Sequence, residues 1–547
     1  MIPNWKILRN SISLVLIIVM CTVSLTACGK KATEAAKKDV GNNQKESKLI
    51  NESGMPIVNE PITLKVMASQ SPTQPPFNET MVMQEYEKMT NMRVEWNMVP
   101  WASIKEKKNI TLASGEYPDV FFRMKVTLSD IVTYGAEQGV FLKLNDLIDQ
   151  YAPNIKQMFE EYPEIRKGLT APDGGIYCLP RVIDADFASM RTGVRFWIRE
   201  DWLKKLGLKE PTTTEELYDV LKAFKDKDPN GNDEADEIPL TGLNIGGLII
   251  DLSGAYGLNN RGKGQLFIDQ NDNGELRFIP ADEQYRDMIL YLNKLYTEGL
   301  LDQEIFTKKW KTVVAHASND IFGCYAGFSP VLLNQEGYIG LGVIEGPKGD
   351  KLFSGVMPIL ETPGMAVITS SNKYPEATMR WLDYMYSEEG ARLFNMGIEG
   401  ETYNVTSDGK YEFTDIITNN PDGLSLDQAR NLYMPSVSGW AGITMEKYFR
   451  GSEASIPALE AAKKTKPYHV KEVWPNLTYT TEENSKLSGL SADILNYVKE
   501  IRAKVIIGQY KFDDRGWNKY IETLNKMGLK EYMEINTQAY ERYANSK

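Results

Sequence analysis

The chain has 547 residues, a formal net charge of −12, and a composition that is 42% hydrophobic and 10% aromatic. A strongly acidic chain is unsuited to binding nucleic acid or an anionic membrane surface, because like charges repel. The apolar and aromatic content predicts a globular protein, and the length is sufficient for two domains.

Residues 1–27 have the pattern of a secretory signal peptide. Lys6 and Arg9 precede an apolar stretch of roughly 10 residues, which is too short to span a bilayer. The segment ends in Leu-Thr-Ala-Cys, which resembles the lipobox of bacterial lipoproteins. This resemblance implies that Cys28 carries a lipid such as palmitate and anchors the protein on the extracellular face of the cell membrane. The alternative is an ordinary signal peptide that happens to contain a cysteine.

Residues 28–60 are predicted to form a flexible tether. The segment is rich in Lys, Glu, Asn and Ser and contains no aromatic residue. Such a composition buries too little apolar area to offset the entropy of folding, so the segment is expected to hold a domain away from the membrane.

The folded part begins with a β-α-β unit. The sequence predicts a strand at 62–68, a helix around 81–89 and a second strand at 92–99. Segment 113–122 predicts a turn into a buried strand, and segment 139–152 leads into another helix. Strands that alternate with helices favour an α/β fold, in which helices cover both faces of a parallel or mixed sheet.

A second set of elements begins with a strand at 196–199. The next helix follows Pro211, and Thr213 with Glu216 predicts a capping box at its start. A hairpin is expected at 265–279, with an Asn-Gly turn.

Two later segments are predicted as well. Segment 366–394 predicts a strand followed by two helices, and the C-terminal part carries two apolar stripes at helical spacing.

The stretch DKDPNGNDEADE at 226–237 contains six carboxylates and resembles the opening of an EF-hand calcium loop. Oxygen donors stand at positions 1, 3, 5, 7 and 9, which are Asp228, Asn230, Asn232, Glu234 (through its backbone carbonyl) and Asp236. Position 6 is Asp233 instead of Gly, and position 12 is Pro239, so the usual bidentate Glu is missing. Glu237 is the candidate to replace it. A solvated acidic turn is the alternative, and the similar turn at 269–274 is predicted to be only a hairpin turn.

Cys178 and Cys324 lie in apolar surroundings and are predicted to be buried thiols, although a disulfide between them stays open. The sequence contains no GxxxxGK[ST] phosphate loop, no GxSxG elbow and no HExxH motif. Nothing in these motifs points to an enzyme.

Several stretches of the mature chain together resemble family 1 extracellular solute-binding proteins of bacterial ABC transporters, as found in Gram-positive lipoproteins. The stretches are ASGEYPDVFF (113–122), APDGGIYCLP (171–180), segment 197–242, YLNKLYTEGLLD (291–302), segment 366–394 and GIEGETYNV (397–405). The resemblance implies a type II periplasmic-binding-protein fold, with two α/β lobes joined by a hinge that the chain crosses more than once. The first lobe would hold 61–187 with 353–430, and the second 188–352 with 431–547, including the acidic loop.

The same resemblance implies a function. Such proteins are not enzymes; they capture a solute, often an oligosaccharide, in a cleft between the lobes and deliver it to an ABC transporter permease. We expect this chain to do so as a monomer. Some oligosaccharide-binding members carry calcium in a loop of this kind, which favours a structural calcium ion in the acidic loop.

Candidate ligand-binding residues follow from the chemistry of sugars. The apolar faces of sugar rings stack on aromatic side chains, and their hydroxyls bind amide, carboxylate and guanidinium groups. In open α/β sheets ligands bind where strands end. The candidates at strand ends and in glycine-flanked loops are Trp101, Trp197, Arg199, Tyr256, Tyr403 and Trp440. Each is alternatively a core residue, and Trp197 most of all, since Trp-Ile-Arg also reads as a buried strand.

Three other functions are alternatives to this one. A protein of the same fold that binds a peptide or another small solute is the main alternative. A secreted polysaccharide-degrading enzyme would need two carboxylates placed across a cleft, and no pair stands out. A purely structural surface lipoprotein is a further alternative. An acidic sugar would require a cationic cleft, which the net charge makes less natural.

Overall fold

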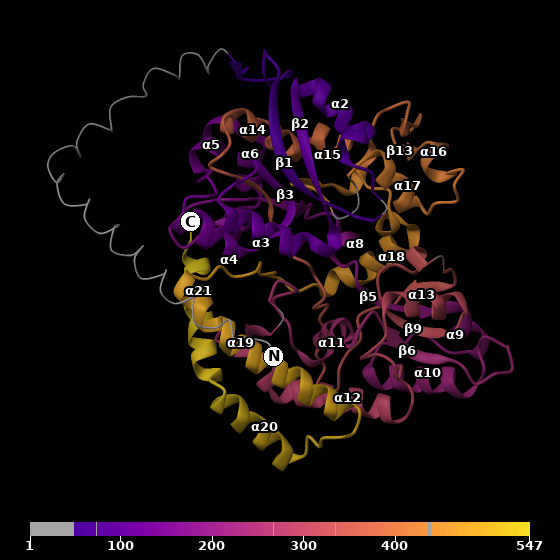
Figure 1. Ribbon diagram of the computed structural model, residues 1–547. Coiled ribbons are helices and arrows are strands. Elements are labelled where there is room, and N and C mark those ends of the chain that lie inside the picture. The colour runs from indigo at the N-terminus through magenta and orange to yellow at the C-terminus, as the bar shows by residue number, and fades with distance from the viewer. Residues whose placement is uncertain (1–48, 73, 266, 334, 436–438, 547) are drawn as a thin grey trace, which may run out of the picture. The chain divides into compact units, whose positions relative to one another are not determined.

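Two β-sheets, each flanked by helices, form the framework of the protein (Figure 1). The computed structural model describes residues 49–72, 74–265, 267–333, 335–435 and 439–546. All elements named below belong to one compact unit, Asn51–Lys547. The predicted signal peptide, the predicted lipidation site Cys28 and most of the predicted tether lie outside the described residues.

The first sheet has six strands and is parallel except for one member. In spatial order its strands are β14 (Gly442–Thr444), β4 (Leu179–Ile183), β11 (Leu360–Ile368), β3 (Val120–Val126), β1 (Ile62–Gln70) and β2 (Met92–Pro100). Strands β1 and β2 pair in register from Ile62 opposite Met92 to Gln70 opposite Pro100. Strand β11 is antiparallel to both β3 and β4. The predicted mixed sheet is therefore confirmed.

The second sheet has four strands in the order β10 (Tyr338–Gly340), β5 (Arg195–Arg199), β9 (Phe322–Gly327) and β6 (Ile238–Gly242). Strand β5 is antiparallel to β9 and β10, whereas β6 and β9 are parallel. Two hairpins stand apart from the sheets. They are β7 (Ile268–Gln270) with β8 (Leu276–Phe278), and β12 (Tyr403–Val405) with β13 (Tyr411–Phe413).

Helices flank both sheets. With the first sheet lie α2 (Met81–Thr90), α3 (Ile104–Ser114), α4 (Leu128–Asp130), α5 (Asn145–Tyr151), α6 (Pro153–Glu161), α7 (Pro163–Leu169), α14 (Pro375–Asp383), α15 (Glu388–Met396), α16 (Asp415–Thr418) and α17 (Leu426–Tyr433). With the second lie α9 (Glu200–Leu206), α10 (Thr214–Asp226), α11 (Ile245–Ser253), α12 (Glu283–Thr297), α13 (Trp310–Ser318), α19 (Thr481–Ile506), α20 (Asp514–Lys526) and α21 (Leu529–Asn545). Among the described residues no helix combines the length and the apolar character needed to cross a bilayer.

The first sheet is buried because aromatic side chains fill the space between it and its helices. Trp381 on α14 is 1% exposed, and its ring centroid lies 5.7 Å from that of Tyr86 on α2. It also lies 6.4 Å from Trp96 on β2 and 6.2 Å from Phe122 on β3. Such ring pairs add to the hydrophobic burial that fixes the helices on the sheet.

The start of helix α10 corrects one detail of the predicted capping box. Thr213 caps the helix as predicted, since its side chain accepts a hydrogen bond from the Glu216 N–H. The Glu216 carboxylate does not return a bond to Thr213. It accepts instead from the N–H and hydroxyl of Thr212, at 2.8 and 2.7 Å. Thr212 thus offers two donors, its N–H and its hydroxyl, to the Glu216 carboxylate, and this geometry replaces the reciprocal bond.

The assignment of residue ranges to two lobes stays a prediction, with one change to its boundaries. Strand β14 (Gly442–Thr444) pairs in parallel with β4 and so belongs to the first sheet. The predicted boundary at 430/431 would detach this strand from its sheet, and we therefore move it past Thr444. Sequence patterning missed β14 because three residues after a glycine-flanked tryptophan give no strand signal.

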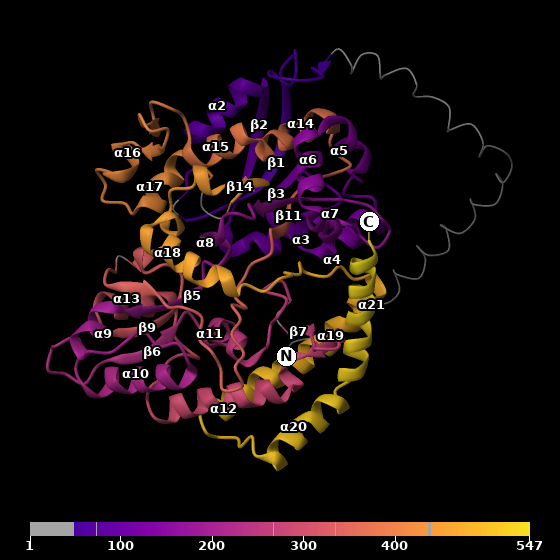
Figure 2. The same cartoon turned by 180° about the vertical axis from the view of Figure 1, so that it is seen from behind.

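The chain passes between the two sheets from β4 to β5 through α8 (Ala188–Arg191), from β10 to β11, and after β14 towards α18 (Ile456–Thr465). Helix α8 connects β4 to β5, and α18 follows β14. Figures 1 and 2 both place these helices between the two sheets. We call segments 184–194 and 445–465, which carry α8 and α18, the crossovers.

Candidate functional site

The topology identifies which edge of each sheet lies near the crossovers. The crossovers leave from Ile183 and Thr444, at the carboxyl ends of β4 and β14, so they start at the carboxyl edge of the first sheet. The crossover from β4 reaches the second sheet at Arg195, the amino end of β5. Because β5 runs antiparallel to β9, this end coincides with the carboxyl ends of β9 and β6. Ligands in open α/β sheets bind at such carboxyl edges.

The carboxyl edge of the first sheet carries a group of polar side chains, which we call the arginine cluster and define as Gln74, Arg123, Arg181 and Glu361. Arg123 Nη1 donates to Gln74 Oε1 at 3.3 Å, and Arg181 Nη1 lies 3.6 Å from Glu361 Oε2. Arg123 is 4% exposed and Gln74 is 3% exposed. Burial, together with the positive charge of Arg181, lowers the pKa of Arg123 to about 9. The charge of the Arg181 guanidinium therefore acts on the buried Arg123.

Several atoms at this edge have no hydrogen-bond partner among the described residues. They are Ser69 Oγ, Gln74 Nε2 and Arg181 Nε. Buried polar groups are normally hydrogen-bonded, and a concentration of exceptions needs an explanation. A polar ligand that brings its own donors and acceptors is one such explanation.

The backbone of β3 is unusual at the same place. Arg123 and Lys125 have φ angles of 61° and 52°, and the register of the partner strand β11 shifts between Gly364 and Ala366. Non-glycine residues in the left-handed region cost about 1–3 kcal/mol each and concentrate where a protein holds a ligand. The Lys125 ammonium lies 4.2 Å from the ring centroid of Trp101, which directly follows β2.

The carboxyl edge of the second sheet carries an exposed aromatic residue. Phe328 directly follows β9, and its side chain is 41% exposed, which is unusual for a phenylalanine. Asn244 follows β6 and caps α11, accepting from the Gly247 N–H at 3.0 Å. An exposed aromatic ring at a strand end is suited to stacking on an apolar ligand face.

A buried ion pair ties the crossovers to the second sheet. Arg195 Nη2 lies 3.0 Å from Glu453 Oε2, and the two side chains are 0% and 6% exposed. Arg195 Nη1 also donates to the carbonyl oxygen of Ala458 in α18, and the Ser329 N–H donates to Glu453 Oε1 at 3.3 Å. Burial raises the pKa of Glu453 to about 7.

A cavity of about 1230 Å³ lies beside the crossovers. Its lining comes from residues that follow β4 and β14, from the β12–β13 hairpin and from α18, and includes Asp184, Tyr411, Glu446, Arg450, Leu459 and Lys463. This volume is large enough for a ligand of several sugar rings.

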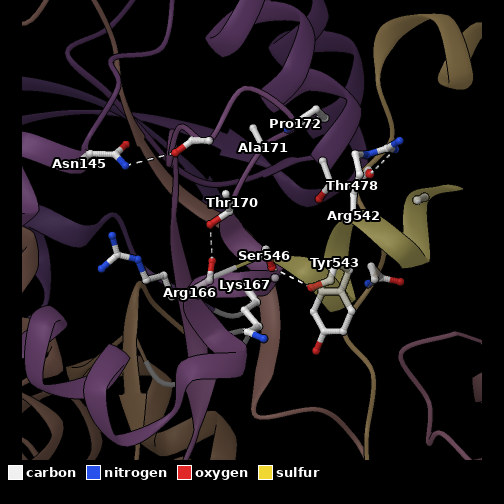
Figure 3. Close-up of a pocket in the computed structure, with 14 residues that line it drawn as sticks. Asn145, Arg166, Lys167, Thr170, Ala171, Pro172, Thr478, Arg542, Tyr543 and Ser546 are labelled. Atoms are coloured by element: carbon white, nitrogen blue, oxygen red, sulfur yellow. Dashed lines mark hydrogen bonds between the residues drawn. The ribbon is translucent and has the colours of Figure 1, made fainter.

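A smaller cavity of about 350 Å³ lies between the loop after α7 and the end of α21 (Figure 3). Its polar groups are largely bonded to nearby backbone. Thr170 Oγ1 donates to the Arg166 carbonyl, and Ser546 Oγ to that of Tyr543. We therefore regard it as a less suitable ligand site.

The structure separates the six residues predicted to bind ligand. Trp101 is 39% exposed at the carboxyl end of β2, where a ligand can reach it. Trp197 is fully buried in β5, and its indole N–H donates to the Gly327 carbonyl. Arg199 is 5% exposed and pairs with Asp201 and Asp320. These internal contacts account for Trp197 and Arg199 without a ligand.

Tyr256, Tyr403 and Trp440 are also buried, at 5%, 3% and 2% exposed. Trp440 stacks on Phe394 with a ring separation of 5.7 Å, and its position just before β14 puts it on the first sheet. The ligand-binding role of all six residues stays a prediction, and Trp101 is the one that an approaching solute can contact in this structure.

The acidic loop folds as a series of tight turns. Asp228 Oδ1 accepts from the Gly231 and Asn232 N–H groups, and Asp228 Oδ2 accepts from that of Asp233. The amide groups of Asn230 and Asn232 donate to Asp236 at 3.1 Å. Asp233 has a φ of 62°, so this residue adopts the left-handed conformation for which a loop of this kind normally uses glycine at position 6.

The donor set of the loop fits a calcium ion. Glu237 Oε1 is buried with no hydrogen-bond partner among the described residues, and burial together with the charges of Asp228 and Asp236 raises the pKa of Glu237. A cation would relieve both features. Among the described residues no cluster of three or more His, Cys, Asp or Glu side chains has metal-binding geometry, so asparagine and backbone oxygens would have to complete the site.

Both cysteines of the folded part are free thiols and are fully buried. Burial raises the pKa of each thiol to about 12. They behave as small apolar residues, as predicted, and the disulfide that the sequence left open is not formed.

Sequence reasoning missed the arginine cluster and Phe328. A signal for the cluster was present, since Arg123 interrupts the apolar run Val-Phe-Phe-Arg-Met-Lys-Val and Arg181 follows Cys-Leu-Pro. A charged residue inside a buried strand requires a partner or a function. Phe328 had no such signal, because an aromatic residue beside apolar ones reads as core.

Two curated relatives match most of the chain. It is 31% identical over 508 residues to the fructooligosaccharide ABC transporter substrate-binding protein FusA of Streptococcus pneumoniae serotype 4 (strain ATCC BAA-334 / TIGR4), which covers 89% of this chain and 91% of FusA. It is 26% identical to lipoprotein LipO of Bacillus subtilis (strain 168), covering 88% of this chain and 92% of LipO.

Solved structures of two such proteins superimpose on this one. FusA of S. pneumoniae in complex with kestose gives a TM-score of 0.73 at 28% identity, over 89% of this chain and 100% of that one. An EF-hand mutant of FusA with fructo-nystose gives 0.72 at 28%, over the same shares. Alginate-binding protein AlgQ2 without calcium ion gives 0.68 at 27%, over 88% and 99%. These likenesses confirm the periplasmic-binding-protein fold.

The family model for bacterial extracellular solute-binding proteins matches residues 67–392, which is more than half of the chain. This match includes most of the first sheet and the whole of the second. With the relatives and the shared fold, it shows that the chain belongs to the family of bacterial extracellular solute-binding proteins.

Proposed function

We propose that this protein captures an oligosaccharide between the carboxyl edges of its two sheets and delivers it to an ABC importer. The observation that carries the proposal is the concentration of unpartnered polar atoms at the carboxyl edge of the first sheet, among them Gln74 Nε2 and Arg181 Nε. A hydroxyl-rich ligand supplies the donors and acceptors that these atoms lack. FusA, a relative of similar length, is named for fructooligosaccharide.

Aromatic side chains complete the proposed site. Trp101 on the first sheet and Phe328 on the second are both exposed at strand ends. We propose that they stack on sugar rings, while guanidinium and amide groups bind the hydroxyls. Such a site binds and releases its ligand unchanged, which is the role of a substrate-binding protein and not of an enzyme.

Thermal melting against a ligand panel tests the proposal. The panel contains neutral oligosaccharides, acidic oligosaccharides and short peptides, each added to the protein in calcium buffer. A ligand at 100 times its Kd adds about 2.7 kcal/mol to the free energy of unfolding, which raises the melting midpoint. We expect a rise with one class of oligosaccharide. A rise with peptides alone would refute the carbohydrate proposal and leave the assignment to the family unchanged.

We propose further that the acidic loop holds a structural calcium ion. The residues that would hold it are Asp228, Asn230, Asn232, Glu234, Asp236 and Glu237. Calcium would supply positive charge to a loop crowded with carboxylates and would fix its conformation. One relative of known structure has an EF-hand mutant, and another was solved without calcium ion.

Calcium is expected to raise the melting midpoint of the wild-type protein, and chelation is expected to reverse the rise, because a ligand that binds only the folded state stabilises it. In the variant Asp236→Ala the response to calcium should be lost. The control is Asp272→Ala in the turn of the β7–β8 hairpin, which should respond as the wild type does. A wild-type midpoint that ignores calcium would contradict the proposal.

We propose that lipidation of Cys28 anchors the protein on the extracellular face of the membrane, beside the permease that receives its ligand. The lipobox resemblance supports this, as does the similarity to LipO, which is named as a lipoprotein. Labelled palmitate is expected to enter the wild-type protein and not Cys28→Ser in cells. Equal labelling of both would place the lipid elsewhere.

A further inference from the structure

We propose that the oligosaccharide captured by this protein carries carboxylate groups, and that Arg181, beside Arg123, receives one of them. The inference rests on the proposed function and narrows its ligand to an acidic class. The support for this inference comes from the arginine cluster alone. The net charge of the chain, −12, gives no reason to expect an anionic ligand.

Two positively charged side chains, those of Arg123 and Arg181, lie near each other in the first sheet. Arg123 lies on β3 and Arg181 on β4, and the antiparallel strand β11 separates the two strands. The Arg123 residue is 4% exposed and the Arg181 side chain 17% exposed. The positive charge of Arg181 acts on Arg123 strongly enough to contribute to its lowered pKa. Bringing two cations together in a poorly solvated place costs free energy, which a bound anion would offset.

Arg181 makes no close ion pair within the described part of the protein. Its Nη1 lies 3.6 Å from Glu361 Oε2, which is longer than a hydrogen bond. Its Nε is buried and has no hydrogen-bond partner among the described residues. The Glu361 carboxylate also accepts a hydrogen bond from the Thr362 hydroxyl. A guanidinium that serves only to hold a fold together normally makes a close, bidentate pair, as Arg277 does with Asp269 at 2.7 and 2.8 Å.

A glycine and an amide group lie beside the two arginines. Gly439, with a φ of 70°, lies against Arg181, and a Cβ there would come within 2.4 Å of Arg181 Nε. Gln74 is 3% exposed, and its Nε2 has no partner among the described residues while its Oε1 accepts from Arg123. The glycine thus leaves room for the guanidinium, and the neighbouring amide offers a donor to the same ligand.

A carboxylate matches this arrangement better than a hydroxyl does. Guanidinium and carboxylate groups have complementary planar geometry and form two parallel hydrogen bonds, with opposite charges in contact. A hydroxyl can accept one hydrogen bond but brings no negative charge. Sugars with a carboxylate are uronic acids, and galacturonate and mannuronate residues both supply it.

Isothermal titration calorimetry tests the inference with matched ligands. The probes are trigalacturonate, trimannuronate, the methyl ester of trigalacturonate, and neutral kestose. We expect at least one acidic trimer to bind. If trigalacturonate binds, its methyl ester, which keeps the ring shape without the charge, should bind at least tenfold more weakly. Which acidic trimer binds more tightly identifies the source of the carboxylate.

Variants locate the interaction. Arg181→Gln should weaken binding of the acidic trimer at least tenfold, and Arg181→Lys, which keeps the charge, should restore part of the loss. The control Arg93→Gln changes an exposed arginine near the amino end of β2 and should leave affinity unchanged. Melting curves without ligand identify any variant that fails to fold. If Arg181→Gln fails to fold, the affinity of Arg181→Lys for the acidic trimer is measured at increasing salt concentration instead.

Three outcomes would overturn the inference. If the inference is right, kestose and the methyl ester bind more weakly than the acidic trimers. Equal affinity of a neutral and an acidic ligand therefore refutes the inference and leaves the proposed function intact. An unchanged affinity for the acidic trimer in Arg181→Gln also refutes it. Binding by neither acidic nor neutral oligosaccharides removes the proposed function and the inference together.

Discussion

Replacing Arg195 with methionine is expected to lower the free energy of unfolding by about 3–5 kcal/mol, because it leaves the Glu453 carboxylate buried without its partner. The two side chains are 0% and 6% exposed, and the pair joins a crossover to the second sheet. Arg195 also donates to backbone carbonyl oxygens of Ser189 and Ala458, so several buried acceptors lose their donor at once. Urea denaturation followed by tryptophan fluorescence measures the change.

Two controls separate the loss of the pair from a general effect of substitution. Replacing both partners, as Arg195→Met with Glu453→Leu, should restore a large part of the lost stability, since no uncompensated charge stays buried. Lys486→Met removes a solvent-exposed pair with Glu482 on α19 and should leave the denaturation curve unchanged. A loss of less than about 1 kcal/mol in Arg195→Met would show that the pair does not hold the crossover in place.

Trp381→Ala is expected to cost about 3–5 kcal/mol of stability, as large-to-small substitutions of buried aromatic residues do. Trp381 is 1% exposed and packs on Tyr86, Trp96 and Phe122 between α14 and the first sheet. Its carbonyl oxygen still accepts from the Tyr86 hydroxyl in the variant, so the loss reports the cavity. Thermal and urea denaturation both measure it.

The matched control is Trp101→Ala, which removes a tryptophan that is 39% exposed. We expect this variant to fold with nearly wild-type stability and to bind oligosaccharide more weakly. Trp381→Ala should bind normally wherever it stays folded. The reverse pattern, with Trp101 needed for stability and not for binding, would contradict the assignment of these two residues.

The elements of the first sheet were predictable because their patterns are local. The strands at 62–68 and 92–99, the helix between them and the buried strand after 113–122 all appear where the sequence predicts them. Each pattern depends on burial of one face or of a whole strand, and the spacing of apolar residues within the segment indicates that burial. Strand β14 escaped prediction because its three residues form a strand only by pairing with β4, which is distant in sequence.

The ligand site was predictable only in part, because aromatic composition does not distinguish a core from a cleft. Trp440 and Trp101 look equally suitable in sequence, yet one is 2% exposed and the other is 39% exposed. The acidic loop folds into tight turns, and its role in calcium binding stays a prediction. Its left-handed residue at position 6 is Asp233, which a search for glycine passes over.

The central claim is that ligand lies between the carboxyl edges of both sheets, and one measurement tests it most directly. The affinity of the oligosaccharide that raises the melting midpoint is measured by calorimetry for the wild type, for Arg181→Gln on the first sheet and for Phe328→Ala on the second. The account predicts that each variant loses at least tenfold in affinity while staying folded. Wild-type affinity in both variants would show that the ligand is held elsewhere and would contradict the account.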